Sequence, residues 1–553
     1  MSRRAFILLT GGAAGLGLLS ACSSPTAPAA GGSSSGPAAL ATSKPIAPVA
    51  ATASPAAAGA PVAAASPVAA SAAPAAKRGG TLTLLRTAAI TSFNPTQINP
   101  GHYPFLRALY NTPIRYDQNL NPVPDLAEKF ELGGDGLSLK IELKKGVTFH
   151  SGRELTSDDV VFTLEWFKDP KNNSAIRAAV GLVTKAETPD KYTVVLRFDR
   201  PNPGVYDMLD LLFIVDKNTV DKYASSGGGT GPFKLAEYQP GELARFTPYE
   251  GYFEKGKPYL AEYVVKQVAD AQTMALQLES GSADVVWIPN YNDLVRLSKD
   301  PKFQVSPGAP GAFYWDIAVN TSKPDLGDKR VRQAISYAVD RERFARTAMA
   351  GLVEPTSLNM PRSSWAYFPE LEGKHKRDMA KAKQLMADAG KSAGFEVVLL
   401  TSAKRAAGMR ELAEILQSDL AEIGIKAKIE DVELAQYEER QQNSVFDLSI
   451  HSYGRANKDP GTLYTGAVAW FAKGGWTKID DADYAAMIQK AGSLVDREQR
   501  KAEYRKIQEY VLDQSFTIPV CEQPRAFAWR AHVKNFAVTL DNVPYVSEIW
   551  LDK

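Results

Sequence analysis

The stretch from residue 395 to residue 430 constrains the fold more than any other part of the chain. It begins with a continuously apolar run, Val397-Val398-Leu399, which is typical of a strand buried on both faces. A helical pattern follows, with apolar residues recurring on one face at Leu412, Ile415, Leu416, Leu420 and Ile423. Gly424 is expected to end this helix, and a second strand begins at Ile425. Strand, crossover helix and strand in this order predict a parallel sheet with a right-handed connection.

A second ordered pattern lies in residues 125–161. Apolar and polar residues alternate from Leu137 to Leu143, which predicts a half-buried strand. After a turn, Thr156 or Ser157 can cap a helix whose first turn is acidic, as the helix dipole favours. Asp169-Pro170 is expected to end that helix.

The order of residues in segment 125–161 resembles the signature of the extracellular solute-binding proteins of family 5, which serve ABC importers of peptides, nickel and opines. Three further blocks resemble the same family in the same order: Gly229-Thr230-Gly231-Pro232-Phe233, residues 278–285 and residues 320–341. The resemblance covers Arg78 to the C-terminus. It implies an α/β fold with two lobes, the type II periplasmic-binding-protein fold of cluster C, with an extra small lobe in the first half.

The resemblance also implies domain boundaries, and the length of the chain beyond the N-terminal region suits more than one lobe. Lobe I is expected to consist of residues 79–115, 228–312 and 522–553. The extra small lobe is expected at residues 116–227, and lobe II at residues 313–521.

The N-terminus reads as a lipoprotein signal peptide over residues 1–22. Arg3 and Arg4 precede a mostly apolar run that is too short to span a membrane. Leu19-Ser20-Ala21-Cys22 resembles a lipobox, which predicts a lipid on Cys22. The arginine pair resembles a twin-arginine export signal, and a plain basic start for the general export route stays open as the alternative.

A linker is predicted at residues 23–78. From Ser23 to Ala76 the chain is mostly Ala, Pro, Ser and Gly, with Lys44 as the only charge and almost no large apolar side chains. Such a segment buries too little apolar surface to offset the entropy of ordering. The expected location is therefore extracytoplasmic, with a lipid anchor in the cell membrane and a tether that lifts the folded body clear of it; which membrane holds the anchor stays open.

Composition excludes several classes of function. The 64 basic and 62 acidic residues nearly balance, so no nucleic-acid partner is expected. The chain has two cysteines, Cys22 and Cys521, and no spacing typical of a metal site, so we expect no disulfide, no metal and no cofactor. No nucleophile with a base is visible, so the chain is not expected to be an enzyme such as a hydrolase. A monomer is expected.

Candidate ligand-binding residues follow from the resemblance. A loop after Ser92-Phe93-Asn94-Pro95 lies in the ligand cleft of relatives, and strand ends in lobe II face the same cleft. For Tyr314 and Asp316 the alternative is a core tyrosine and a surface acid, and each tryptophan could equally be a core residue. The predicted ligand-binding residues are His102, Tyr103, Tyr314, Asp316, His451, Tyr453, Gly454, Arg455, Asn457 and Trp476.

The sequence bears on what the small-molecule ligand is. In peptide-binding relatives, an Asp ahead of an acidic-Pro pair binds the terminal ammonium of the peptide. Alignment on Asp459-Pro460 places Ala456 at that position, with Arg455 beside it. We therefore expect a ligand without an obligatory free ammonium and with an anionic group for Arg455. Asp459 or Asp316 could supply the missing carboxylate instead.

The expected partners are the permease subunits of an ABC importer and the membrane, through the lipid anchor. The class of ligand stays open among peptides, opines, sugars and metal chelates. A tethered ligand sensor or surface-interaction protein on the same fold is the alternative to transport.

Overall fold

The computed structural model describes residues 76–88, 90–98, 102–117, 120–223, 228–288, 290–306, 313–454, 458–523, 526–537 and 544–553. These residues belong to one compact unit. Within the described ranges, no helix is both long enough and apolar enough to cross a membrane.

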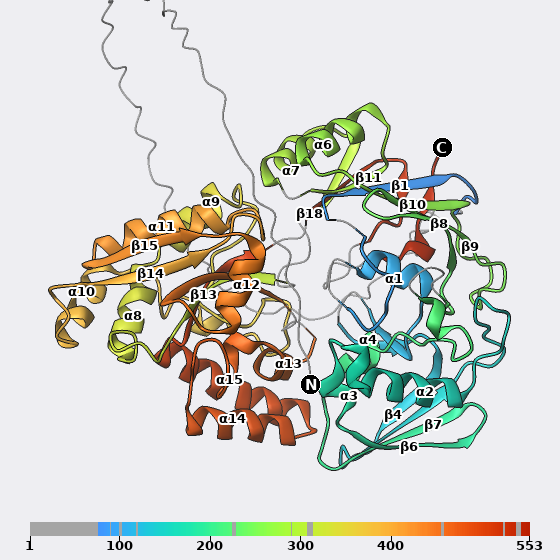
Figure 1. The fold of residues 1–553 in the computed structure, drawn as a ribbon, viewed down its shortest axis with the longest axis horizontal. Coiled ribbons are helices and arrows are strands. Elements are labelled where there is room, and N and C mark those ends of the chain that lie inside the picture. The colour runs from blue at the N-terminus through green and yellow to red at the C-terminus, as the bar shows by residue number, and fades with distance from the viewer. Residues whose placement is uncertain are drawn as a thin grey trace, which may run out of the picture. The chain divides into compact units, whose positions relative to one another are not determined.

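A seven-stranded mixed sheet gathers strands from both ends of the chain (Figure 1). Its order is β12-β18-β11-β1-β10-β9-β8, and the central β1 runs parallel to both β10 and β11. The strands are β1 (Thr81–Arg86), β8 (Phe233–Gln239), β9 (Leu243–Pro248), β10 (Glu262–Gln267), β11 (Val285–Ile288), β12 (Phe303–Ser306) and β18 (Ala526–Arg530). Its helices are α1 (Tyr103–Leu109), α6 (Ala271–Ser280) and α7 (Tyr291–Leu297).

A four-stranded antiparallel sheet, in the order β4-β5-β7-β6, contains the predicted alternating strand. Leu139, Ile141 and Leu143 are buried in β5 and pack in one core with helix α2, whereas Leu137 just before the strand is 37% exposed. The strands are β4 (Ala127–Leu132), β5 (Ser138–Leu143), β6 (Val183–Asp190) and β7 (Thr193–Phe198). The nearby helices are α2 (Ser157–Lys168), α3 (Arg177–Val180) and α4 (Val205–Leu211).

The start of α2 explains why the segment around residues 151–161 holds together. Thr156 is the N-cap, and its backbone N–H donates to the Asp159 carboxylate at 2.9 Å. Arg153 binds the same carboxylate at 2.6 Å and Asp216 at 2.7 Å. Both aspartates are almost fully buried, and one arginine forms ion pairs with both carboxylates. The polar residues of segment 151–161 therefore hold the start of α2 in place.

A five-stranded sheet, in the order β15-β14-β16-β13-β17, forms the second α/β body. β14 and β15 are parallel, with Phe395 opposite Ile425, which confirms the predicted strand-helix-strand unit. Helix α11 ends at Ala421 rather than at Gly424; Gly424 instead occupies the turn after it, with φ +85°. The strands are β13 (Phe313–Val319), β14 (Phe395–Thr401), β15 (Ile425–Asp431), β16 (Leu448–Gly454) and β17 (Thr517–Gln523).

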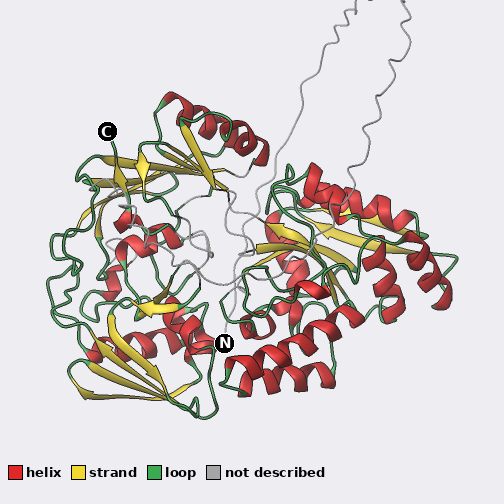
Figure 2. Cartoon of the chain, turned by 180° about the vertical axis from the view of Figure 1, so that it is seen from behind, coloured by secondary structure: helices red, strands yellow, loops and turns green. Residues whose placement is uncertain are grey.

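Helices cover both faces of this sheet (Figure 2). Trp315 of β13 lies in the core shared with α9 and α11, whereas Tyr314 lies in the core shared with α13 to α15. The helices are α8 (Lys329–Ala338), α9 (Arg341–Thr347), α10 (Met379–Asp388), α11 (Met409–Ala421), α12 (Leu434–Gln442), α13 (Gly461–Gly466), α14 (Ala482–Ser493) and α15 (Arg497–Gln514). A strand covered on both sides buries every side chain, whatever its polarity.

Two short pairs of strands complete the sheets: β2 (Ile114–Tyr116) with β3 (Pro122–Pro124), and β19 (Val533–Lys534) with β20 (Trp550–Leu551). We call the elements from β1 to β12 and from β18 to β20 lobe I, and those from β13 to β17 lobe II. The chain therefore passes between the lobes twice, after β12 and after β17. The finer boundaries given above stay predictions.

Candidate functional site

For several of the predicted site residues, the structure describes only the backbone or does not describe the residue. Arg455 and Asn457 are outside the described residues, as is Cys22. Tyr103 is the first residue of α1, and Tyr453 and Gly454 end β16, but only their backbone is described. Their role in binding stays a prediction.

His102 lies immediately before α1 in lobe I. It is 8% exposed, its Nδ1 is 3.1 Å from the backbone oxygen of Gln97, and its ring lies 5.2 Å from that of Phe105. Burial lowers the pKa of His102, and the charge of Arg86 adds to this effect although the contact with Gln97 opposes it. The imidazole is therefore neutral at pH 7.

Arg86 is a functional candidate that the sequence patterns did not single out. It is the last residue of β1, and its guanidinium lies 5.8 Å from the Phe105 ring and 5.4 Å from the Trp287 ring. Burial lowers the pKa of Arg86 to about 10. The group still carries its charge at pH 7, so lobe I has a cation at a carboxyl strand end, where ligands of α/β sheets bind. The available signal was an arginine at the end of the stretch Thr81-Leu82-Thr83-Leu84-Leu85, in which polar and apolar residues alternate.

In lobe II the structure brings two predicted residues together inside the protein. Asp316 and His451 are direct partners on β13 and β16, and they are 0% and 1% exposed. Burial raises the pKa of Asp316 to about 7, and burial lowers the pKa of His451 to about 3. Trp476 is partly buried beside them, with its ring 5.4 Å from that of His451.

The burial of β13 decides between the alternatives given above for Tyr314 and Asp316. Tyr314 is 2% exposed and packs in the core with α15, as a core tyrosine would. The alternative to a binding role for Asp316, that it is a surface acid, is wrong because helices cover both faces of its sheet. In this structure neither residue offers its side chain to solvent.

A cluster of charged residues joins α4 of lobe I to the residues just before α13 of lobe II. Lys458 binds the carboxylate of Asp210, and the backbone N–H of Asp459 donates to Asp207 Oδ2 at 3.2 Å. We call this cluster the interlobe network; its members are Arg107, Tyr116, Asp207, Asp210, Lys458, Asp459, Arg500 and Tyr504.

The lobe I half of the network is held by its own hydrogen bonds. Arg107 Nη2 lies 2.6 Å from Asp210 Oδ1, and the Tyr116 hydroxyl donates to Asp207 Oδ1 at 2.6 Å. Burial raises the pKa of Asp207 to about 7, and the charge of Asp459 across the contact raises it further. This carboxyl therefore holds a proton far more readily than an exposed one.

The lobe II half contains a bidentate ion pair between Arg500 and Asp459. The Arg500 guanidinium binds both oxygens of Asp459 at 2.7 Å, and the backbone N–H of Gly461 donates to the same carboxylate at 2.8 Å. Arg500 is 5% exposed and also donates to the Tyr504 hydroxyl at 2.9 Å. The carboxylate of Asp459 is thus engaged within lobe II.

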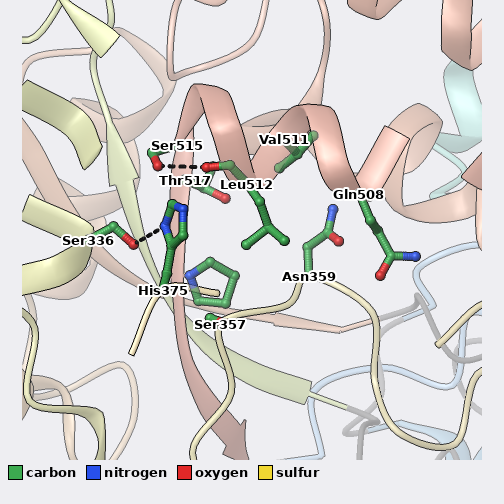
Figure 3. A pocket seen from close by; sticks show the side chains of 10 residues that line it. Ser336, Ser357, Asn359, His375, Gln508, Val511, Leu512, Ser515 and Thr517 are labelled. Atoms are coloured by element: carbon green, nitrogen blue, oxygen red, sulfur yellow. Dashed lines mark hydrogen bonds between the residues drawn. The ribbon is translucent and has the colours of Figure 1, made fainter. Parts of the chain in front are cut away.

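A small cavity lies in lobe II between α15 and the Ser336-His375 pair, whose side chains are joined by a 3.0 Å hydrogen bond (Figure 3). Its volume of ≈ 10 Å³ is enough for about one water molecule and far below that of a solute pocket. Among the residues that the structure describes, no group of three or more His, Cys, Asp or Glu side chains is placed to hold a metal ion.

Comparisons with known proteins bear on this arrangement. Residues 121–475 match the family model described as bacterial extracellular solute-binding proteins, family 5, middle. Heme-binding protein A of Haemophilus influenzae is 27% identical over 479 residues, which cover 80% of this chain and 86% of that protein. The dipeptide-binding protein of Escherichia coli is 26% identical over 501 residues, covering 84% and 93%.

A solved structure agrees with these relatives. The binding protein AgaA in complex with agropinic acid, from A. tumefaciens R10, matches with a TM-score of 0.74 and 26% identity over 86% of this chain and 99% of that one. The fold is therefore that of two-lobed type II periplasmic binding proteins, and the relatives are binding proteins rather than enzymes.

Proposed function

Because this chain belongs to the bacterial extracellular solute-binding proteins of family 5, we propose that it captures one small solute between its two lobes and delivers it to an ABC permease. The observation that carries the proposal is the family match together with two α/β lobes between which the chain passes twice. Two such connections let lobes rotate about a hinge, and a ligand that contacts both lobes selects the closed state. Cys22 would anchor the protein outside the cytoplasm.

We further propose that the solute needs no free N-terminal ammonium. Two carboxylates could have replaced the one missing at Ala456, and both are engaged elsewhere or buried. Asp459 is held by the Arg500 guanidinium, and Asp316 is 0% exposed inside lobe II. An ammonium left in a closed cleft without a carboxylate loses a charge-assisted bond and keeps its desolvation cost.

Cations at the predicted site favour an anionic group on the solute. Arg455 stays the predicted partner in lobe II, and Arg86 would add positive charge from the carboxyl end of β1 in lobe I. A planar guanidinium suits a carboxylate or phosphate because it donates two parallel hydrogen bonds.

Calorimetric titration tests the ligand proposal. The protein is titrated with di- to pentapeptides and with the same peptides after N-acetylation, and the E. coli dipeptide-binding protein serves as the positive control. We expect no peptide whose affinity depends on a free amino group. Sub-micromolar binding that acetylation abolishes would overturn the proposal.

A further inference from the structure

The interlobe network divides its charge unequally between the lobes. Its six ionisable acid and base groups are three cations, Arg107, Lys458 and Arg500, and three carboxylates, Asp207, Asp210 and Asp459. The lobe I half has one cation and two carboxylates, and the lobe II half has two cations and one carboxylate. Lys458, the cation in excess on the lobe II half, meets the Asp210 carboxylate of the lobe I half, so this pair attracts the lobes whether or not Asp207 carries a charge.

The contact between the halves excludes water. The side chain of Asp210 is 1% exposed, and that of Lys458 is 10% exposed. The Lys458 ammonium also lies 5.2 Å from the Tyr116 ring of lobe I. In such an environment opposite charges attract more strongly than at an exposed surface, where water and salt screen them.

The two halves depend on the contact to different degrees. Arg107 stays with Asp210, and Arg500 stays with Asp459, whether or not the lobes meet, because each pair belongs to one lobe. Lys458 binds Asp210 only across the contact, and so does the Asp459 N–H with Asp207. These two bonds therefore stabilise only the state in which the lobes touch.

We propose that Lys458 and Asp459 of lobe II and Asp207 and Asp210 of lobe I form a latch that holds the lobes together without a solute. The inference rests on the proposed function, in which the solute binds between the lobes. A latch makes the closed state a substantial part of the ligand-free ensemble, so less of the binding free energy of the solute is spent on closure. Lys458 and Asp210 thereby tune affinity without touching the solute.

Distance measurements between spin labels test the latch in the ligand-free protein. Cysteines replace the exposed Leu276 on α6 and Leu434 on α12 in the full chain carrying Cys22→Ser, and the buried Cys521 is left in place. Double electron–electron resonance spectroscopy then gives the distribution of distances between the two labels in the parent and in Lys458→Met.

The parent should show mostly the closed distance, and Lys458→Met should lower the closed-to-open ratio about tenfold, since the buried Asp210 carboxylate then keeps Arg107 but loses its bond across the contact. Lys404→Met is the matched control, because Lys404 pairs with Glu433 inside lobe II at an exposed position. Lys458→Arg should keep the closed population. Asp210→Asn, which leaves the segment around Lys458 intact, provides a second way to remove the bond if Lys458→Met does not fold.

Two outcomes would overturn the latch: a parent that is already open without solute, or distances that Lys458→Met and Asp210→Asn leave unchanged. No solute is added in these measurements. Failure of the latch is therefore distinguishable from failure of solute binding, which the titrations test separately.

Discussion

Replacing Arg500 by Met should destabilise lobe II strongly, because it leaves Asp459 buried without its partner. Met fills much of the space of the arginine stem, so the change isolates the loss of charge and hydrogen bonds rather than a large cavity. Burial opposes the charged form of Arg500, but the charge and hydrogen bonds of Asp459 raise the pKa of Arg500 above the ordinary value, so Arg500 is charged in the parent.

The expected magnitude follows from the structure. Removing one partner of a buried ion pair costs about 3–5 kcal/mol. We therefore expect a loss of about 3–5 kcal/mol at pH 7.

Urea denaturation followed by circular dichroism at pH 7 measures this loss in the full chain. Arg505→Met is the matched control on the same helix, α15, because Arg505 is 44% exposed and pairs with surface acids. The control should cost less than about 1 kcal/mol. If Arg500→Met is no more destabilising than Arg505→Met at pH 7, the reasoning about Asp459 is wrong.

Three further predictions follow from other parts of the chain. Gly231→Ala should cost more than about 1 kcal/mol in the same urea assay, because its Cβ would lie 2.4 Å from the Ala108 backbone oxygen, whereas Gly134→Ala meets nothing within 4 Å and should be neutral. Cys22→Ser should move the protein from the membrane to the soluble fraction of cells; a variant that stays membrane-bound would contradict lipid anchoring. The closed population of the ligand-free protein should fall as pH rises through about 7, because the charge of Asp459 across the contact adds to the burial that raises the pKa of Asp207. Spin-label distances at pH 6 and pH 8 measure this, and Asp207→Asn should remove the change.

Local patterns were enough to predict several elements correctly. Thr156 caps α2 because Asp159, an acidic residue three positions later, can accept a hydrogen bond from the Thr156 backbone N–H, and both residues are visible in the sequence. The ends of α6 carry local signals of the same kind: Asp270 accepts from the Thr273 N–H at the start, and Gly281 has φ +86° at the end. Signals of this kind depend only on neighbours along the chain.

Contacts between distant segments were beyond these patterns. Asp316 alternates along β13 as a surface acid would, yet helices far along the chain cover that face and bury it. Lys458 and Asp210 are separated by 248 residues, and nothing near either residue indicates that they meet. Family resemblance predicted a site region, but the partners of the charged residues depend on tertiary packing.

Native mass spectrometry of the full chain purified from its native cells tests the central claim most directly. Spectra are recorded before and after denaturation, and the released compound is treated with an amine-acylating reagent. The account predicts one small solute bound per chain, lost on denaturation and not dependent on a free N-terminal amine. A bound mixture of peptides with free amino termini would contradict it.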